Sequence, residues 1–166
     1  VHAETSTGAQ SDVAKLVKLA HAHDSLTIVD AVTSLGGTPV KVDEWEIDAV
    51  YSGSQNCLSC TTGISPVSFN ERALGKVRNR KTKVQSWFLD LNLVMGYWGE
   101  GAKRAYHHTA PINPLYCLHE ALTLLREEGI ENAWVRHRKN HEALRDGFEA
   151  SACGLLPGPV GPARLL

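Results

Sequence analysis

Residues 26–32, Leu-Thr-Ile-Val-Asp-Ala-Val, decide the fold of this chain. Their apolar and β-branched side chains form an unbroken run, which is typical of a strand in a parallel sheet that helices cover on both faces. Two further apolar runs follow: residues 47–51, after the turn-rich segment 34–39, and a stretch that ends at residues 66–69. The sequence therefore predicts an α/β fold with a mostly parallel sheet and flanking helices.

Helices are predicted around these strands. A serine and an aspartate at positions 11–12 can each cap the first helix, whose apolar residues recur at i, i+3, i+4 and i+7 on one face. The clearest helix begins at Pro114, repeats leucine along one face and stops at Gly129. Residues 70–78 and 131–148 also have helical patterns.

The composition limits the kinds of binding partner that we expect. Seventeen Lys and Arg residues against eighteen Asp and Glu residues leave a net charge of -1 over 166 residues, so no overall field attracts nucleic acid or an anionic membrane. No apolar run approaches the roughly 18 residues of a membrane-spanning helix, and the first residues show no signal-peptide pattern. We therefore expect neither a nucleic acid nor a membrane as partner.

Asp30 is the first candidate for chemistry. It stands near the carboxyl end of the predicted strand, where folds of this class bind ligands, and a carboxylate there costs free energy to bury unless a cation or a donor meets it. A helix N-cap or another structural carboxylate is the alternative interpretation. The small polar residues 52–56 follow the next strand, and the two polar strand ends share one pocket if the strands are neighbours.

Several motifs together indicate a family. In chain order they are 4–8 (ETSTG), 27–37 (TIVDAVTSLGG), 51–55 (YSGSQ), 80–83 (RKTK) and 106–111 (YHHTAP). They resemble the class V, pyridoxal-phosphate-dependent aminotransferases of the alanine–glyoxylate (serine–pyruvate) type. The resemblance implies that residues 1–150 are part of the cofactor-binding large domain of the type I fold. Residues 151–166, rich in Gly and Pro, are expected to be a divergent, disordered tail.

The resemblance also implies roles for individual side chains. Asp30 matches the aspartate that pairs with the pyridinium nitrogen of the cofactor, where a carboxylate keeps the ring an electron sink. Thr5 matches a hydroxyl residue near the ring, and Gln55 matches a residue near the phosphate. Tyr106 and Thr109 match residues that reach the cofactor phosphate of the partner subunit, so a homodimer is implied.

Asn56 departs from the family pattern. The position belongs to the lysine that binds the cofactor as a Schiff base and later moves a proton, and both tasks need an amine. An amide is neither nucleophilic nor basic, so covalent attachment at Asn56 is not possible. We therefore expect the catalytic position to be lost and transamination to be impaired, although Asp30 and the phosphate contacts can still hold pyridoxal 5'-phosphate without a covalent bond.

The family transfers an amino group to glyoxylate or pyruvate, so small amino acids and 2-oxo acids are the implied substrates. Peroxisomes or mitochondria are the implied location, and no targeting signal is readable. The chain opens on Val1, and the family's glycine-rich phosphate turn, ring-stacking aromatic residue and substrate-binding arginine find no match in it. We accordingly expect a fragment of poor stability in isolation. The alternative to an enzyme is a non-catalytic, truncated relative that acts as a dimer partner.

Other features carry weaker signals. Cys57 and Cys60 have the spacing of a zinc or redox pair, but without a second pair we interpret them as loop thiols and expect no metal site. The basic residues 76–83 are interpreted as a solvated or intersubunit surface rather than a nucleic-acid patch. His107 and His108 are expected to shape the phosphate loop. Large aromatic side chains are expected in the core or at a dimer interface: Trp87, Tyr97 and Trp98.

Overall fold

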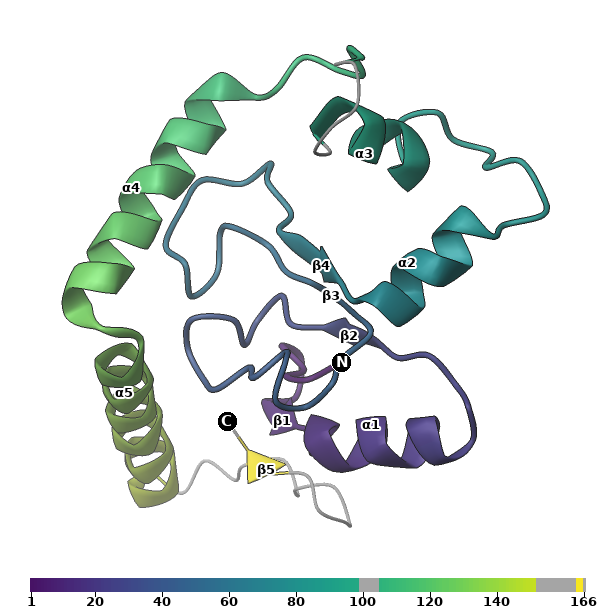
Figure 1. The fold of residues 1–166 in the computed structure, drawn as a ribbon. Coiled ribbons are helices and arrows are strands. Elements are labelled where there is room, and N and C mark those ends of the chain that lie inside the picture. The colour runs from purple at the N-terminus through teal and green to yellow at the C-terminus, as the bar shows by residue number, and fades with distance from the viewer. Residues whose placement is uncertain (99–104, 152–163, 166) are drawn as a thin grey trace.

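Short strands at the centre are surrounded by helices (Figure 1). The computed structural model describes residues 1–98, 105–151 and 164–165. In chain order its elements are β1 (Ala9–Gln10), α1 (Val13–Ala22), β2 (Ile28–Asp30), β3 (Ala49–Tyr51), β4 (Val67–Phe69), α2 (Glu71–Arg78), α3 (Leu91–Trp98), α4 (Ile112–Glu128), α5 (Ile130–Ala150) and β5 (Arg164–Leu165).

The central sheet has the strand order β2-β3-β4. β2 and β3 run parallel, with Asp30 opposite Tyr51, whereas β4 runs antiparallel to β3. The α/β class with flanking helices is confirmed. The sheet within the described residues is mixed, because residues 52–66 lead the chain back alongside β3 in the opposite direction. The parallel pair brings the carboxyl ends of β2 and β3 to the same edge.

The core lies between α1 and the sheet. Asp12 caps α1 by accepting a hydrogen bond from the backbone N–H of Lys15 at 3.2 Å, which agrees with the predicted helix start. Val13 and Val17 of this helix are buried in one cluster with Val29 of β2. Removing such apolar surface from water is the main favourable contribution to folding.

α4 and α5 form an arc along one side of the sheet (Figure 1). Gly129 joins them with a φ of 84°, so the predicted helix stop at this glycine is confirmed. α4 begins at Ile112, two residues before the predicted start at Pro114. Pro114 therefore lies in the first turn of the helix. A proline is tolerated there, because backbone N–H groups in the first turn have no partner within the helix. Leucines of its apolar face line a cavity of about 250 Å³ against the loops after β2 and β3: Leu118, Leu122 and Leu125.

α2 and α3 complete the helices on the other side. Asn70 caps α2 by accepting a hydrogen bond from the N–H of Ala73 at 2.9 Å, and the helix covers the predicted residues. α3 was not predicted from the sequence, because its apolar residues surround the helix and form no one-sided stripe. Trp87 and Trp98 are exposed, so they are not core residues, and an interface role for them stays a prediction.

β1 and β5 form a separate antiparallel pair in which Ala9 lies opposite Leu165. Most of the predicted tail, residues 152–163 and 166, lies outside the described residues, so its disorder stays a prediction. None of the helices in the described part of the chain is both long and apolar enough to cross a membrane.

Candidate functional site

The carboxyl ends of β2 and β3 form the candidate site. Asp30 is the last residue of β2, and its Oδ2 accepts a hydrogen bond from the hydroxyl of Tyr51, the last residue of β3, at 2.7 Å. Its Oδ1 accepts a hydrogen bond from the backbone N–H of Val32 at 2.9 Å. Two neutral donors therefore meet this partly buried carboxylate, and the two polar strand ends lie together as the sequence predicts.

The same bond acts on Tyr51. Because its hydroxyl donates to a carboxylate, and because burial and the negative charge of Asp30 act in the same direction, the pKa of Tyr51 is raised above its ordinary value. The phenol therefore remains protonated, and remains a donor, across the neutral range. This donor helps to orient Asp30 along the edge of the sheet.

Asn56 connects the loop after β3 to the loop after β2. Its Nδ2 donates to the backbone carbonyl of Val32 at 2.9 Å. Val32 is thus held on both sides, its N–H by Asp30 and its carbonyl by Asn56. The Asn56 side chain is exposed, so it lies at the surface of the site and not in the core.

Thr5 and Gln55 lie on the segments that adjoin these strand ends. The hydroxyl oxygens of Thr5 and Thr33 are 2.6 Å apart, which brings the N-terminal segment to the loop after β2. Gln55 is exposed and folds over Gly53, where an added Cβ would lie 2.8 Å from Oε1 of the glutamine. The absence of a side chain at Gly53 therefore permits this close approach.

Two serines hold the loop after β3. The hydroxyl of Ser52 donates to the carbonyl of Ala31 at 3.0 Å, and the hydroxyl of Ser54 donates to the carbonyl of Thr61 at 2.5 Å. Both serines are buried. Their hydroxyl protons are therefore used within the protein, and the two residues support the site without facing a ligand as donors.

Tyr106 and Thr109 lie apart from the strand ends, in the segment between α3 and α4 at the top of Figure 1. Their hydroxyl oxygens are 2.5 Å apart, and Tyr106 is 72% exposed. His107 is buried between them: its ring stacks on Trp87 with 4.1 Å between the ring centroids. The histidine therefore shapes this loop, as expected, and the segment between α3 and α4 lies away from β2 and β3 in Figure 1.

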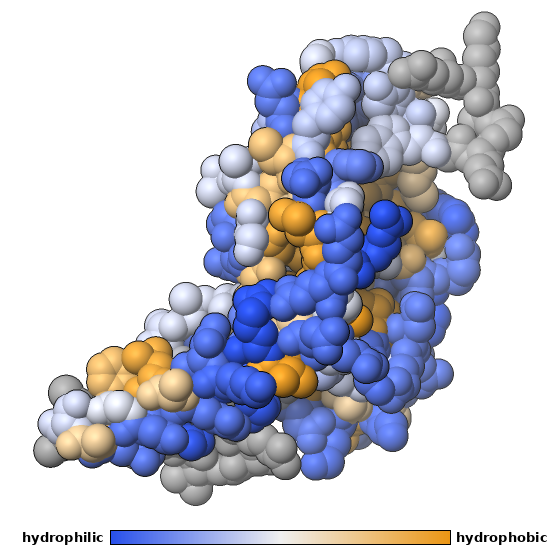
Figure 2. All heavy atoms as spheres, turned by 90° about the vertical axis from the view of Figure 1, so that its left-hand side faces the viewer, coloured by the Kyte–Doolittle hydropathy of each residue, from blue (hydrophilic) through white to orange (hydrophobic). Residues whose placement is uncertain are grey.

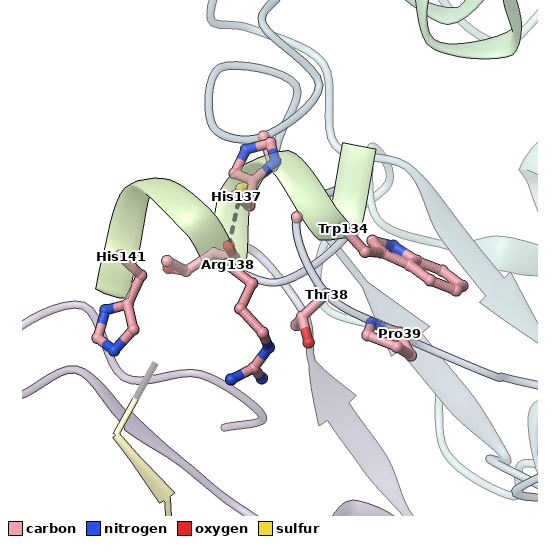
Figure 3. A pocket seen from close by; sticks show the side chains of 9 residues that line it. Thr38, Pro39, Trp134, His137, Arg138 and His141 are labelled. Carbon is pink, nitrogen blue, oxygen red and sulfur yellow. Dashed lines mark hydrogen bonds between the residues drawn. The ribbon is translucent and has the colours of Figure 1, made fainter. Parts of the chain in front are cut away.

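A second hollow lies between the loop after β2 and α5 (Figure 3). It has a volume of about 210 Å³, and four of its lining residues come from α5 at the i, i+3, i+4 and i+7 spacing of one helix face: Trp134, His137, Arg138 and His141. The indole Nε1 of Trp134 is buried and has no hydrogen-bond partner among the described residues. This face of α5 was not predicted as part of a site, although the helical spacing of its polar and aromatic residues is visible in the sequence.

Cys57 lines the same hollow from the loop after β3. Its Sγ donates to the carbonyl of Thr33 at 3.2 Å, and burial raises the pKa of the thiol, which makes it a weak nucleophile near neutral pH. Cys57 and Cys60 are both free thiols. Within the part of the chain that the structure describes, no three His, Cys, Asp or Glu side chains are grouped to hold a metal ion.

Comparison with known proteins relates this geometry to a family. The family model described as aminotransferase class-V matches residues 1–159. Alanine–glyoxylate aminotransferase of Rattus norvegicus is 45% identical over 150 residues, a match that covers 87% of this chain and 36% of the rat protein. The sequence similarity thus extends over most of the chain and includes both strand ends of the candidate site.

Solved structures have the same fold. The crystal structure of alanine–glyoxylate aminotransferase from Nostoc sp. matches with a TM-score of 0.85 at 48% identity, over 90% of this chain and 39% of that protein. The ureidoglycine–glyoxylate aminotransferase of Bacillus subtilis matches with a TM-score of 0.84 at 36% identity, over 97% of this chain and 45% of that protein. The chain therefore spans less than half the length of these relatives.

Proposed function

The chain belongs to the class V aminotransferases, and from that premise we propose that it holds pyridoxal phosphate without a covalent bond at the ends of β2 and β3 and is impaired in transamination. The observation that carries the proposal is Asn56, which stands where the family pattern has a lysine. Amino-group transfer to glyoxylate or pyruvate is the activity expected of an intact family member, with small amino acids and 2-oxo acids as substrates.

Asp30 suits the ring of this cofactor. When bound, pyridoxal phosphate supplies an electron sink, provided that a carboxylate keeps its ring nitrogen protonated. The two oxygens of Asp30 each accept one hydrogen bond, from Val32 and Tyr51, and each has further acceptor capacity. Asp30 can therefore accept a third hydrogen bond from a protonated ring nitrogen without losing the two that position it.

Asn56 does not suit the covalent part of the chemistry. An amide nitrogen is delocalised, so it neither attacks an aldehyde nor takes up a proton near neutral pH. In this chain the nitrogen is also engaged, because Nδ2 donates to the carbonyl of Val32. The residues present can bind and orient the ring, while the proton transfer that the family assigns to lysine is left without a base.

Thr5 and Gln55 complete the proposed site, near the ring and near the phosphate respectively. The pairing of the Thr5 and Thr33 hydroxyls supports the first assignment, since it holds Thr5 next to the loop after β2. The exposure of Gln55 on the loop after β3 supports the second, since its amide is accessible to a ligand. A peroxisomal or mitochondrial location is part of the same proposal and rests on the family alone.

A second candidate function is that of a non-catalytic partner in a dimer. Tyr106 and Thr109 are then the residues that reach the cofactor phosphate of the partner subunit, and their exposed segment lies away from this chain's own strand ends. Figure 2 shows apolar side chains, in orange, among polar ones on the face that α4 and α5 form. Large exposed apolar side chains near α3 and α4 favour an interface. They include Trp87, Phe88, Trp98, Ile112 and Tyr116.

Addition of pyridoxal phosphate to the purified chain tests the main proposal. We expect saturable quenching of tryptophan fluorescence and no turnover of alanine with glyoxylate. Asn56→Lys is the matched gain-of-function variant, and borohydride reduction followed by mass spectrometry should find a cofactor adduct at residue 56 in this variant. Turnover by the unsubstituted chain, or the absence of any cofactor binding, contradicts the proposal.

The dimer proposal has a separate test. Two copies of the chain with different affinity tags are expressed together, and one tag is used for purification. We expect the second copy to copurify, and light scattering after size-exclusion chromatography to give the mass of a dimer. Tyr106→Phe should then weaken cofactor binding without changing that mass. A chain that elutes as a monomer at every concentration tested is not a dimer partner.

A further inference from the structure

The hollow between the loop after β2 and α5 has the dimensions of a site for a small molecule. Its volume of about 210 Å³ is below the roughly 300 to 1,000 Å³ of sites for drug-sized ligands. Pro39 and the ring of Trp134 lie at the same end of the hollow in Figure 3 and give it an apolar wall. The apolar body of a small ligand therefore fits against this wall.

Side chains around the hollow offer hydrogen-bond donors. The hydroxyl oxygen of Thr38 accepts a hydrogen bond from Nε2 of Gln10 at 3.3 Å, which leaves its own proton for another acceptor. The indole N–H of Trp134 is buried without an acceptor among the described residues, which costs free energy. The guanidinium of Arg138 carries donors only. The hollow therefore suits a ligand that brings acceptors.

Arg138 makes a negatively charged acceptor the best match. Its Nη1 lies 3.8 Å from Oε1 of Glu142, beyond hydrogen-bond distance, and its side chain is 63% exposed. No Asp or Glu is among the described residues that line the hollow. Figure 3 shows the side chains of Arg138 and His141 extending from α5 on the side of Thr38. An anion that enters there meets a positive charge and further donors.

The two histidines of this face differ. Nδ1 of His137 donates to the carbonyl of Ala133 at 2.8 Å, since a carbonyl only accepts, and in Figure 3 its ring lies on the other side of α5 from Arg138. His141 makes no hydrogen bond within the described residues, so either of its ring nitrogens is free to carry the proton that it offers to an anion. His141 is therefore the histidine that joins Arg138.

We propose that this hollow is a binding site for a small carboxylate with an apolar or aromatic body. The carboxylate binds the donors of Arg138, His141 and Thr38, because the planar guanidinium fork matches a carboxylate. The body packs against Pro39 and Trp134. The site differs from the proposed cofactor site at the ends of β2 and β3, so a failure of cofactor binding would leave it unaffected.

Titration of the full chain with three probes tests the proposal: benzoate, benzamide, which is a neutral analogue of the same shape, and acetate, which lacks the ring. Nuclear magnetic resonance of the isotopically labelled chain gives an indole N–H signal for each of the four tryptophans, and Trp134→Phe assigns the one at the hollow. We expect benzoate to shift the Trp134 signal saturably and to leave the other three in place. Benzoate should bind about tenfold more tightly than either of the other probes.

Two substitutions on α5 isolate the role of the guanidinium. Arg138→Gln should weaken benzoate binding about tenfold and make the affinities for benzoate and benzamide nearly equal. Lys139→Gln removes the same charge from the next position, which is exposed and does not line the hollow, so it should change neither affinity. Circular dichroism confirms that both variants are folded.

Several results would overturn the proposal. The Trp134 signal does not move with benzoate, or benzamide or acetate binds as tightly as benzoate to the unsubstituted chain. Either result needs no variant and refutes the site as described. A preference for benzoate that survives in Arg138→Gln, or an equal loss in Lys139→Gln, would show that Arg138 does not bind the carboxylate.

Discussion

The hydroxyl of Tyr51 donates to the carboxylate of Asp30 at 2.7 Å, across the parallel pair of β2 and β3. The two residues are 21 positions apart in the chain and lie opposite each other in the strand register. The bond stabilises the protonated phenol and so raises the pKa of Tyr51. Tyr51 is therefore a spectroscopic probe of Asp30 that needs no ligand.

Tyr51→Phe should remove the phenol whose pKa is raised by its hydrogen bond to Asp30. Because the pKa is raised in the folded state, the stabilising effect of the bond is fully present below the ordinary phenol pKa of about 10 and is lost as the pH rises through the raised value. The variant should be slightly less stable near neutral pH and should lack this alkaline loss. Ultraviolet absorbance during alkaline titration measures the number of phenolates in each protein. The difference between the two titration curves gives the pKa of Tyr51, and a value at or below about 10 would contradict the prediction.

Asp48→Asn should destabilise the fold substantially. The Asp48 carboxylate is fully buried and accepts hydrogen bonds from four residues: His21, Thr27, Asn70 and Arg72. Together these hydrogen bonds connect α1, the residue before β2, and α2 with its cap. The substitution leaves these donors incompletely satisfied, at a cost of about 2 to 3 kcal/mol in the free energy of unfolding. Urea unfolding near neutral pH measures this loss.

The same substitution has a pH signature. Burial tends to raise the pKa of Asp48, but the hydrogen bonds from Asn70, His21 and Thr27 outweigh it, so the net pKa is lowered. A lowered carboxyl pKa stabilises the folded state above the ordinary value of about 3.9, and this contribution is lost as the pH falls below it. The difference between the two proteins should therefore shrink in acid. Asp24 is an exposed ion-pair partner of Arg72, so Asp24→Asn serves as the control. It should change the free energy of unfolding by less than about 0.5 kcal/mol.

Gly37→Ala should also be destabilising, for a steric reason. An added Cβ would lie 2.6 Å from Sγ of Cys57 and 3.3 Å from Cδ2 of His137, so the loop after β2 and Cys57 on the loop after β3 must move apart. Overpacking of this kind costs about 1 to 3 kcal/mol. Gly75→Ala in α2 meets no atom within 4 Å and should be neutral or stabilising by up to about 1 kcal/mol. Thermal unfolding gives the melting temperatures of the two variants. Adding Cys57→Ala to Gly37→Ala should restore part of the lost stability, because it removes the Sγ atom that the added Cβ meets.

The thiols should react in an order that their environments determine. Cys117 is exposed, whereas Cys57 is partly buried, donates to the carbonyl of Thr33 and has a raised pKa. Alkylation by iodoacetamide near neutral pH, followed by peptide mass spectrometry, should therefore modify Cys117 severalfold faster than Cys57. Addition of urea should remove the difference. Equal rates in the folded protein would mean that Cys57 is more accessible than the structure indicates.

Local sequence patterns predicted most of the elements. One-sided apolar stripes identified α1, together with its capping residue, and α4, and helical patterns identified α2 and α5, because these signals act within one or two turns of helix. α3 lacks both signals and was missed. The apolar run 26–32 identified β2, but only Ile28–Asp30 pairs with its neighbour, because strand ends depend on the partner strand.

The candidate site was predictable in part. Parallel strands end at one edge of a sheet, so the proximity of Asp30 to the loop that begins with Ser52 followed from the strand assignment. The face of α5 that lines the second hollow was not found, because its position against the loop after β2 depends on how two helices turn at Gly129. The antiparallel direction of β4 likewise depended on the path of its connection.

The sequence by itself determined that this chain belongs to the aminotransferases and that position 56 carries an amide, since the chemistry of a side chain does not depend on the fold. Only the tertiary structure decided which donors meet Asp30 and which way the Asn56 amide points. Two of those contacts, Tyr51 with Asp30 and Asn56 with Val32, join residues that are far apart in the chain. They exist because strand pairing sets the register of β2 against β3, and register is a property of two segments together that neither contains alone.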